Sequence, residues 1–153
     1  MRSLRVSTAL PLLLALANPV ASRDFAHRAV EPTKTAAPAR RWKTDVPLRD
    51  GMGRIQGAVE GLQHYEHGHM GPEQATQLAK GITRDVIFIV ANCKLEPRAD
   101  AALHPIIAAL MKGAQALDTR PTDLAAIPPM HGALRDYARQ FDDPGFAALA
   151  QPE

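Results

Sequence analysis

The sequence contains a single cysteine, Cys93, among its 153 residues. One cysteine cannot form an intramolecular disulfide, so the chain does not belong to the disulfide-rich class of small exported domains. In an oxidising compartment Cys93 must be buried, bound to a metal, modified, or paired with another chain. The fold must therefore obtain its stability from a hydrophobic core of its own.

An excess of charge of one sign is also lacking once the N-terminus is set aside. The whole chain has a formal net charge of +2, and Arg2 and Arg5 lie in the first 22 residues, which contain no acidic residue. The remaining residues have 16 basic and 16 acidic side chains. A balanced chain offers no basic surface for nucleic acid by composition, so we expect no nucleic-acid partner.

The N-terminal apolar run, from Val6 to Ala17, is too short to cross a bilayer, which takes about 20 residues. Basic residues precede it and small residues follow it, which is typical of a secretory signal peptide. We expect cleavage near Ser22, a periplasmic location, and no stable membrane insertion of the mature chain. The expected organisation is a signal peptide (1–22), a flexible leader (23–45), a four-helix bundle (46–146) and a loose C-terminal tail (147–153).

Four stretches have apolar residues at helical spacing. The first follows Thr44 or Asp45 as N-cap, and the second runs from Gly71 to about Lys94, where we expect the run V-I-F-I-V to widen the buried stripe. The third follows Asp100 as N-cap, and the fourth opens at Pro128. The clearest stripe consists of Leu48, Met52, Ile55, Val59 and Leu62. Short connections and no strand signal predict an all-α fold, an antiparallel four-helix bundle.

Three motifs show a resemblance to a known group of proteins: W-K-T-D, N-C-K-L-E-P-R-A-D-A-A-L-H and F-D-D-P-G-F. With these motifs the chain resembles small exported proteobacterial proteins, sometimes labelled DnrO-like, over residues 41–146. The closing motif of that group has a His and a Trp where this chain has Asp143 and Phe146. The resemblance implies export and a helical fold, and it implies no biochemical activity.

Two groups of side chains are candidate metal ligands. An antiparallel bundle places Met52, Cys93 and His104 at one end, and a thioether, a thiolate and an imidazole suit copper first and zinc second. At the opposite end it places a second, weaker set: His64, His67, His69 and His131. The alternative for both groups is a plain core and a solvated turn. A b-type haem between Met52 and His104 is a third, less favoured cofactor hypothesis.

Catalytic motifs are missing, since neither G-x-S-x-G nor H-E-x-x-H occurs, and C-x-x-C-H, which attaches c-type haem, does not occur either. Cys93 with His104 is a formal nucleophile pair, but burial on an apolar stripe raises a thiol pKa. We therefore expect no enzyme. The sequence predicts a periplasmic helical bundle that binds or buffers a transition metal, or alternatively a metal-free module that binds an unknown protein partner.

Overall fold

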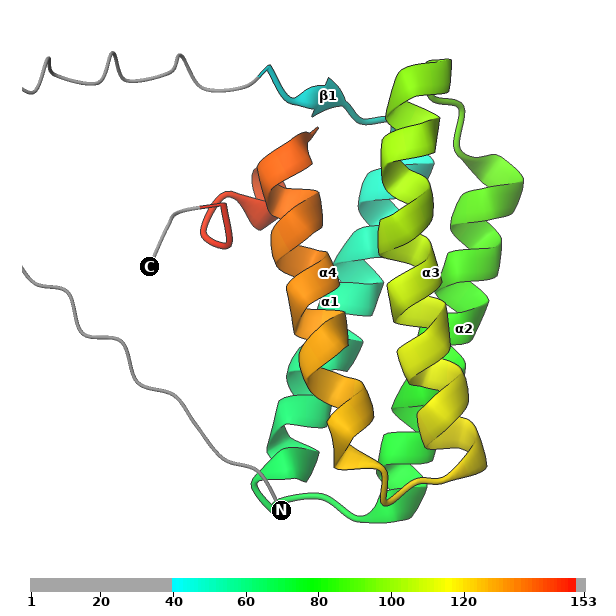
Figure 1. Ribbon diagram of the computed structural model, residues 1–153, viewed down its shortest axis with the longest axis vertical. Helices are drawn as coiled ribbons and strands as arrows, with labels where there is room; N and C mark the ends of the chain where they lie inside the picture. Colours follow the sequence, from blue (N-terminus) through cyan, green and yellow to red (C-terminus); the bar gives the residue numbers. More distant parts are fainter. Residues whose placement is uncertain (1–39, 151–153) are drawn as a thin grey trace, which may run out of the picture. The chain divides into compact units, whose positions relative to one another are not determined.

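A computed structural model describes residues 40–150, in which four helices account for most of the chain (Figure 1). The described residues are mostly helical, which agrees with the predicted all-α class. The predicted signal peptide and residues 23–39 of the predicted leader lie outside the described residues, as do residues 151–153. The elements are β1 (Trp42–Lys43), α1 (Val46–Glu66), α2 (Pro72–Asn92), α3 (Pro97–Thr119), the 3-10 turn η1 (Leu124–Ala126), α4 (Ile127–Gln140), β2 (Phe141–Asp142) and the 3-10 turn η2 (Pro144–Phe146).

The start of α1 is fixed by Asp45, as the sequence predicts. Its side chain accepts a hydrogen bond from the backbone N–H of Leu48 (N···O 2.9 Å), which satisfies one of the donors that a helix start leaves free. Pro47 lies in the first turn, where its missing N–H costs little. The five residues of the clearest predicted stripe, from Leu48 to Leu62, are all fully buried.

The start of α3 differs from the prediction. Asp100 is not the N-cap; the helix begins at Pro97, with Glu96 as its cap, and Asp100 lies in the first turn. Proline favours the first helical position because its φ is preset and its missing N–H would have no partner there. The second helix was predicted to end at about Lys94, whereas α2 ends at Asn92 and Cys93 is its C-cap.

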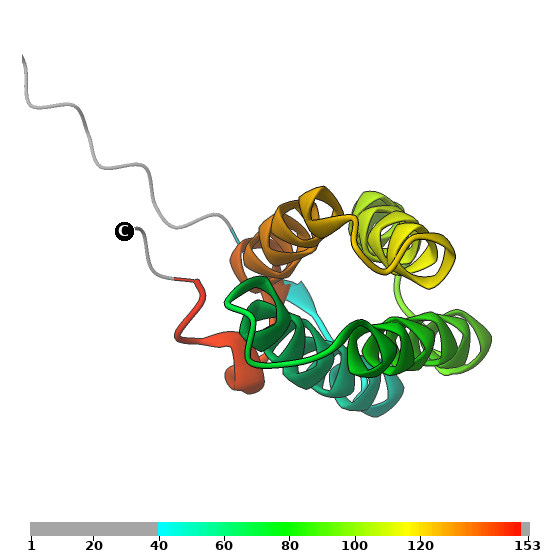
Figure 2. The ribbon, with the colours of Figure 1, turned by 90° about the horizontal axis from the view of Figure 1, so that it is seen from below.

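Residues near the start of α1 contact residues near the end of α2, and residues near the end of α1 contact the start of α2. A Cβ at Gly51, near the start of α1, would come within 2.4 Å of Ile89 near the end of α2, whereas Gly61 faces Leu78 near the start of α2. Two positions without side chains therefore let α1 and α2 approach closely. Viewed along the helices, α1 to α4 follow one another around a common centre (Figure 2).

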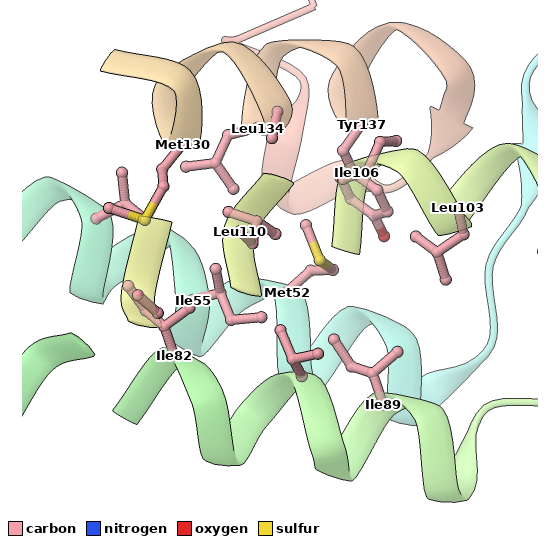
Figure 3. Close-up of a cluster of buried hydrophobic side chains, with 14 of the residues drawn as sticks. Met52, Ile55, Ile82, Ile89, Leu103, Ile106, Leu110, Met130, Leu134 and Tyr137 are labelled. Carbon is pink, nitrogen blue, oxygen red and sulfur yellow. The ribbon is translucent and has the colours of Figure 1, made fainter. Parts of the chain in front are cut away.

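The core lies between these four helices, and Figure 3 shows part of it. Met130 of α4 fills the space over Gly113 of α3, where an added Cβ would lie 2.5 Å from the Met130 Cγ. From the predicted loose tail, Leu149 and Ala150 are partly buried against this core. Three aromatic side chains are buried in the core: Tyr137, Phe141 and Phe146.

A short parallel ladder joins the two ends of the described chain, which the sequence did not predict. Trp42 pairs with Phe141 and Lys43 pairs with Asp142. The segment 40–45, which we assigned to the flexible leader, therefore contains strand β1, and Trp42 is partly buried against the core. The Thr44 hydroxyl extends this link by donating to the backbone carbonyl of Asp142 (2.9 Å).

The apolar run near the end of α2 is buried on one side only. Val86 and Ile89 are buried, but the expected widening of the buried stripe is wrong: the exposed fractions of Ile87, Phe88 and Val90 are 59%, 36% and 67%. The guanidinium carbon of Arg54 in α1 lies 4.9 Å from the centroid of the Phe88 ring, so the Arg54 side chain partly covers that ring. Within residues 40–150, no helix has both the length and the apolar composition that crossing a membrane requires.

Candidate functional site

Cys93 and His104 line the same hollow on the surface between α2 and α3, at the end of the helices that holds the start of α1. The hollow has a volume of about 110 Å³, and its other lining residues are Val90, Asp100, Leu103 and Ile107. The sequence thus placed a thiol and an imidazole together correctly. It missed the carboxylate of Asp100, which it had assigned to a helix cap.

His104 is largely exposed, with 74% of its side chain accessible to solvent. Its Nδ1 lies 2.8 Å from the backbone carbonyl oxygen of Asp100 and 3.6 Å from the Asp100 carboxylate. When Nδ1 carries the proton and donates to that carbonyl, the lone pair of Nε2 is left available to a ligand. The imidazole is therefore positioned by its own helix and presented to solvent.

Cys93 is half-buried, and its surroundings disfavour the thiolate. Burial, and after it the negative charges of Asp45 and Asp100, raise the pKa of the Cys93 thiol. A raised pKa means a small thiolate fraction at neutral pH, so this cysteine is a poor nucleophile when no metal is bound. The same two carboxylates would favour a cation that approached the sulfur.

Replacing Asp100 with Asn should increase the rate at which iodoacetamide alkylates Cys93 at pH 7.5 by at least about twofold. The reason is that loss of one negative charge lowers the thiol pKa and increases the thiolate fraction. Mass spectrometry of timed samples measures the rate. The control is Asp118→Asn at the other end of α3, and an equal increase in both variants would contradict the charge effect.

Met52 does not belong to this hollow. Its side chain is fully buried, and Figure 3 shows it among the packed side chains of the core. Being on the predicted inner stripe, it lies within the core, whereas Cys93 and His104 line the hollow between α2 and α3, which does not include Met52. The predicted set is therefore reduced to two of its three members, and the haem hypothesis loses an accessible Met52 sulfur.

The second predicted histidine set lies around the turn between α1 and α2. His64, His67 and His69 are exposed, and the ring centroid of His69 is 6.3 Å from that of His64 and 6.4 Å from that of His67. His131 is half-buried in α4, and its Nε2 is buried without a hydrogen-bond partner. No group of three or more His, Cys, Asp or Glu side chains within residues 40–150 is arranged to hold a metal ion.

A polar network near β2 was missed entirely by the sequence analysis. Asp143 is buried, and its carboxylate accepts hydrogen bonds from the Tyr137 hydroxyl (2.8 Å) and from the backbone N–H of Gly145 (2.9 Å). Burial, and then the hydrogen bond to Asp143, raise the pKa of Tyr137, so its phenol stays protonated at neutral pH. The D-P-G spacing, an Asx-type turn signal, was the available clue.

The three sequence motifs quoted above meet at one end of the helices. Asp45 accepts hydrogen bonds from Leu48 and from the backbone N–H of Lys94 (2.6 Å), and β1 pairs with β2. The W-K-T-D segment is thus in contact with both other motifs. Comparisons with protein-family models, with curated proteins and with solved structures gave no significant match.

The remaining candidate surface is apolar. Ile87 and Val90 of α2 lie three residues apart on one helix face, and Val90 borders the hollow that contains Cys93, His104 and Ile107. We call these five residues the α2–α3 strip. Solvent-exposed apolar side chains that are contiguous on a folded surface mark an interaction site more often than scattered ones do.

Proposed function

We propose that the protein is an exported, antiparallel four-helix bundle that works in the periplasm as a non-catalytic protein-interaction module. The α2–α3 strip would bind an amphipathic helix from a partner protein. The observation that carries this proposal is the exposure of Ile87 (59%) and Val90 (67%) beside a hollow that continues the same apolar surface.

The length over which α2 and α3 lie side by side favours a helical partner. The two helices are linked at one end by the Lys80–Asp118 ion pair (3.7 Å) and border the hollow at Cys93 at the other. Cys93 follows Lys80 by thirteen residues, which corresponds to about 20 Å at the helical rise of 1.5 Å per residue. An amphipathic helix of three to four turns has about this length and can pack its apolar side chains against two neighbouring helices.

A photo-crosslinking amino acid at position 87 tests the proposal in the native host. We expect one discrete adduct with a partner, and we expect Val90→Asp to reduce that adduct at least about tenfold because a charge must then be desolvated in the contact. Ile87 and Val90 are exposed, so these changes leave the core intact. The crosslinker at position 60, where Glu60 is exposed on α1, is the matched control.

Equal adducts at positions 60 and 87, or an adduct that survives Val90→Asp, would contradict a specific contact through the strip. An adduct between two copies of the chain would mean that the strip mediates self-association rather than binding of a partner helix. Circular dichroism of each variant, compared with the parent, separates loss of binding from loss of fold.

A second function, binding of Cu(I), is favoured by the shared hollow of Cys93 and His104. A thiolate and an imidazole are ligands that copper and zinc accept, and the nearby Asp100 carboxylate adds negative charge. Copper remains the first candidate and zinc the second. The buried Met52 is not part of this proposal.

Titration with Cu(I) against a chromophoric chelator tests the copper proposal. Cys93→Ser and His104→Ala should each weaken binding by at least about tenfold, which is about 1.4 kcal/mol. Met52→Leu and His69→Ala should leave the affinity unchanged, because neither residue lines the hollow. If the Cys93→Ser, His104→Ala double variant binds Cu(I) as tightly as the parent, the α2–α3 hollow is not a copper site.

A further inference from the structure

A separate and larger hollow of about 620 Å³ lies beside β1, in the size range of peptide and ligand sites. It is formed by two segments of the chain, residues 40–45 and the connection between α2 and α3. Its lining residues are Arg40, Arg41, Trp42, Lys43, Thr44, Asp45, Lys94, Leu95 and Glu96. None of them belongs to the α2–α3 strip.

The residues that line the hollow are not confined to one face of strand β1, as expected for a hollow along its edge. Side chains of an extended strand alternate between its two faces, so a hollow on one face is lined by every second residue. This hollow is lined by six consecutive residues, from Arg40 to Asp45. One edge of β1 is occupied by β2. Within residues 40–150, no backbone hydrogen bond joins residues 40–44 to the connection at Lys94–Glu96.

The strand is held firmly enough to act as a template. Its paired edge is tied to β2 by the ladder and by the Thr44 hydroxyl, and the Arg49 guanidinium donates to the Thr44 carbonyl (2.8 Å). At the far end, Asp45 binds the backbone N–H of Lys94 and fixes the opposite wall. An open strand edge of this kind binds an extended peptide by adding it as a further strand.

The charged side chains that line the hollow favour an acidic peptide. Four basic side chains line it against two acidic ones, Asp45 and Glu96. The Asp45 carboxylate is already engaged by two backbone N–H groups. Arg40, Arg41 and Lys43 line the hollow from the β1 segment, and Lys94 lines it from the connection between α2 and α3. Arginine and lysine here would pair with carboxylates on a bound chain.

We propose that an acidic peptide segment of a partner protein binds in this hollow as an extended strand beside β1. Its backbone would hydrogen bond to the open edge, and its Glu or Asp side chains would face the four basic residues. A peptide of five to seven residues in the extended conformation spans about 16–23 Å, which is long enough to contact β1 and the residues on either side of it. This inference goes beyond the proposed helix-binding function and does not depend on it.

Trp42 provides a direct test, because it lines the hollow and is the only tryptophan of the chain. The probe is a seven-residue, Trp-free peptide that alternates glutamate and valine, titrated against the purified protein while Trp42 fluorescence is recorded. We expect a saturable change that weakens as salt is raised. Lys94→Glu should weaken binding at least about tenfold, and Lys112→Glu on α3, outside the hollow, should not.

Two altered peptides separate strand addition from simple charge attraction. A peptide with glutamine in place of glutamate should bind at least about tenfold more weakly. A peptide N-methylated at alternate residues keeps its charge but loses the donors that face the strand edge, and it should lose binding. If the methylated peptide binds as well as the parent peptide, strand addition is wrong.

A saturable response to inorganic phosphate, with no further response to the peptide, would reassign the hollow to small anions and overturn the peptide proposal. No change in Trp42 fluorescence, together with no heat of binding by calorimetry, would also overturn it. Val90→Asp should bind the acidic peptide normally. That result separates failure of this site from failure of the α2–α3 strip.

Discussion

Replacing Ile82 with Ala is expected to lower the free energy of unfolding by about 2–5 kcal/mol. Ile82 is fully buried on α2, and Figure 3 shows it among the packed side chains of the core. The change removes apolar contacts and leaves a cavity that the surrounding helices fill only partly, so both terms reduce stability. Urea denaturation followed by circular dichroism at 222 nm measures the difference.

The control for this prediction lies five residues away on the same helix. Ile87→Ala makes the identical chemical change at a side chain that is 59% exposed, so we expect a change within about 0.5 kcal/mol. The difference between the two variants thus reports burial rather than helix propensity. Equal losses at both positions would mean that α2 is rotated relative to the structure described above.

Replacing Asp143 with Ala is expected to lower the free energy of unfolding by about 2–3 kcal/mol. The buried carboxylate accepts hydrogen bonds from the Tyr137 hydroxyl and the Gly145 backbone, and its removal leaves both donors without their partner. Tyr137 is fully buried and packed edge-on against Phe146, so its hydroxyl has poor access to water. Urea denaturation again gives the measurement.

Asp142→Ala, at the neighbouring exposed residue, is the control for this second prediction. The Asp142 backbone carbonyl accepts the Thr44 hydrogen bond, and an alanine keeps that carbonyl, so the expected change is within about 0.5 kcal/mol. In a Tyr137→Phe background, Asp143→Ala should cost less, because the orphaned hydroxyl is absent. Additive losses in the double variant would argue against the Tyr137–Asp143 hydrogen bond.

The buried stripe of α1 could be predicted from sequence because its spacing leaves a single phase. Apolar residues at intervals of 4, 3, 4 and 3 occupy one face, and all five are buried. The run V-I-F-I-V on α2 has no such spacing, since five consecutive apolar residues surround the helix. The run alone does not indicate which of them face solvent; packing against the neighbouring helices buries Val86 and Ile89 and leaves Ile87 and Val90 exposed.

The candidate site was predictable to the same limited extent. A short connection places the end of α2 next to the start of α3, which is why Cys93 and His104 were expected together. The rotation of α1 about its own axis decides whether Met52 lies beside them, and in the structure the Met52 side chain is buried in the core instead. The ladder between β1 and β2 has only two residue pairs and joins positions 99 residues apart, so no local sequence pattern predicts it.

That ladder has a consequence for how the chain folds. Trp42 and Phe141 are neighbours in space but belong to opposite ends of the folded region, so their pairing closes a loop that contains all four helices. Loop closure over such a length costs conformational entropy that only the assembled helices can offset, whereas each helix hairpin closes over a short turn. The ladder should therefore form after the helices pack. In the native state its amide protons should exchange with solvent through a local opening that leaves the helices intact.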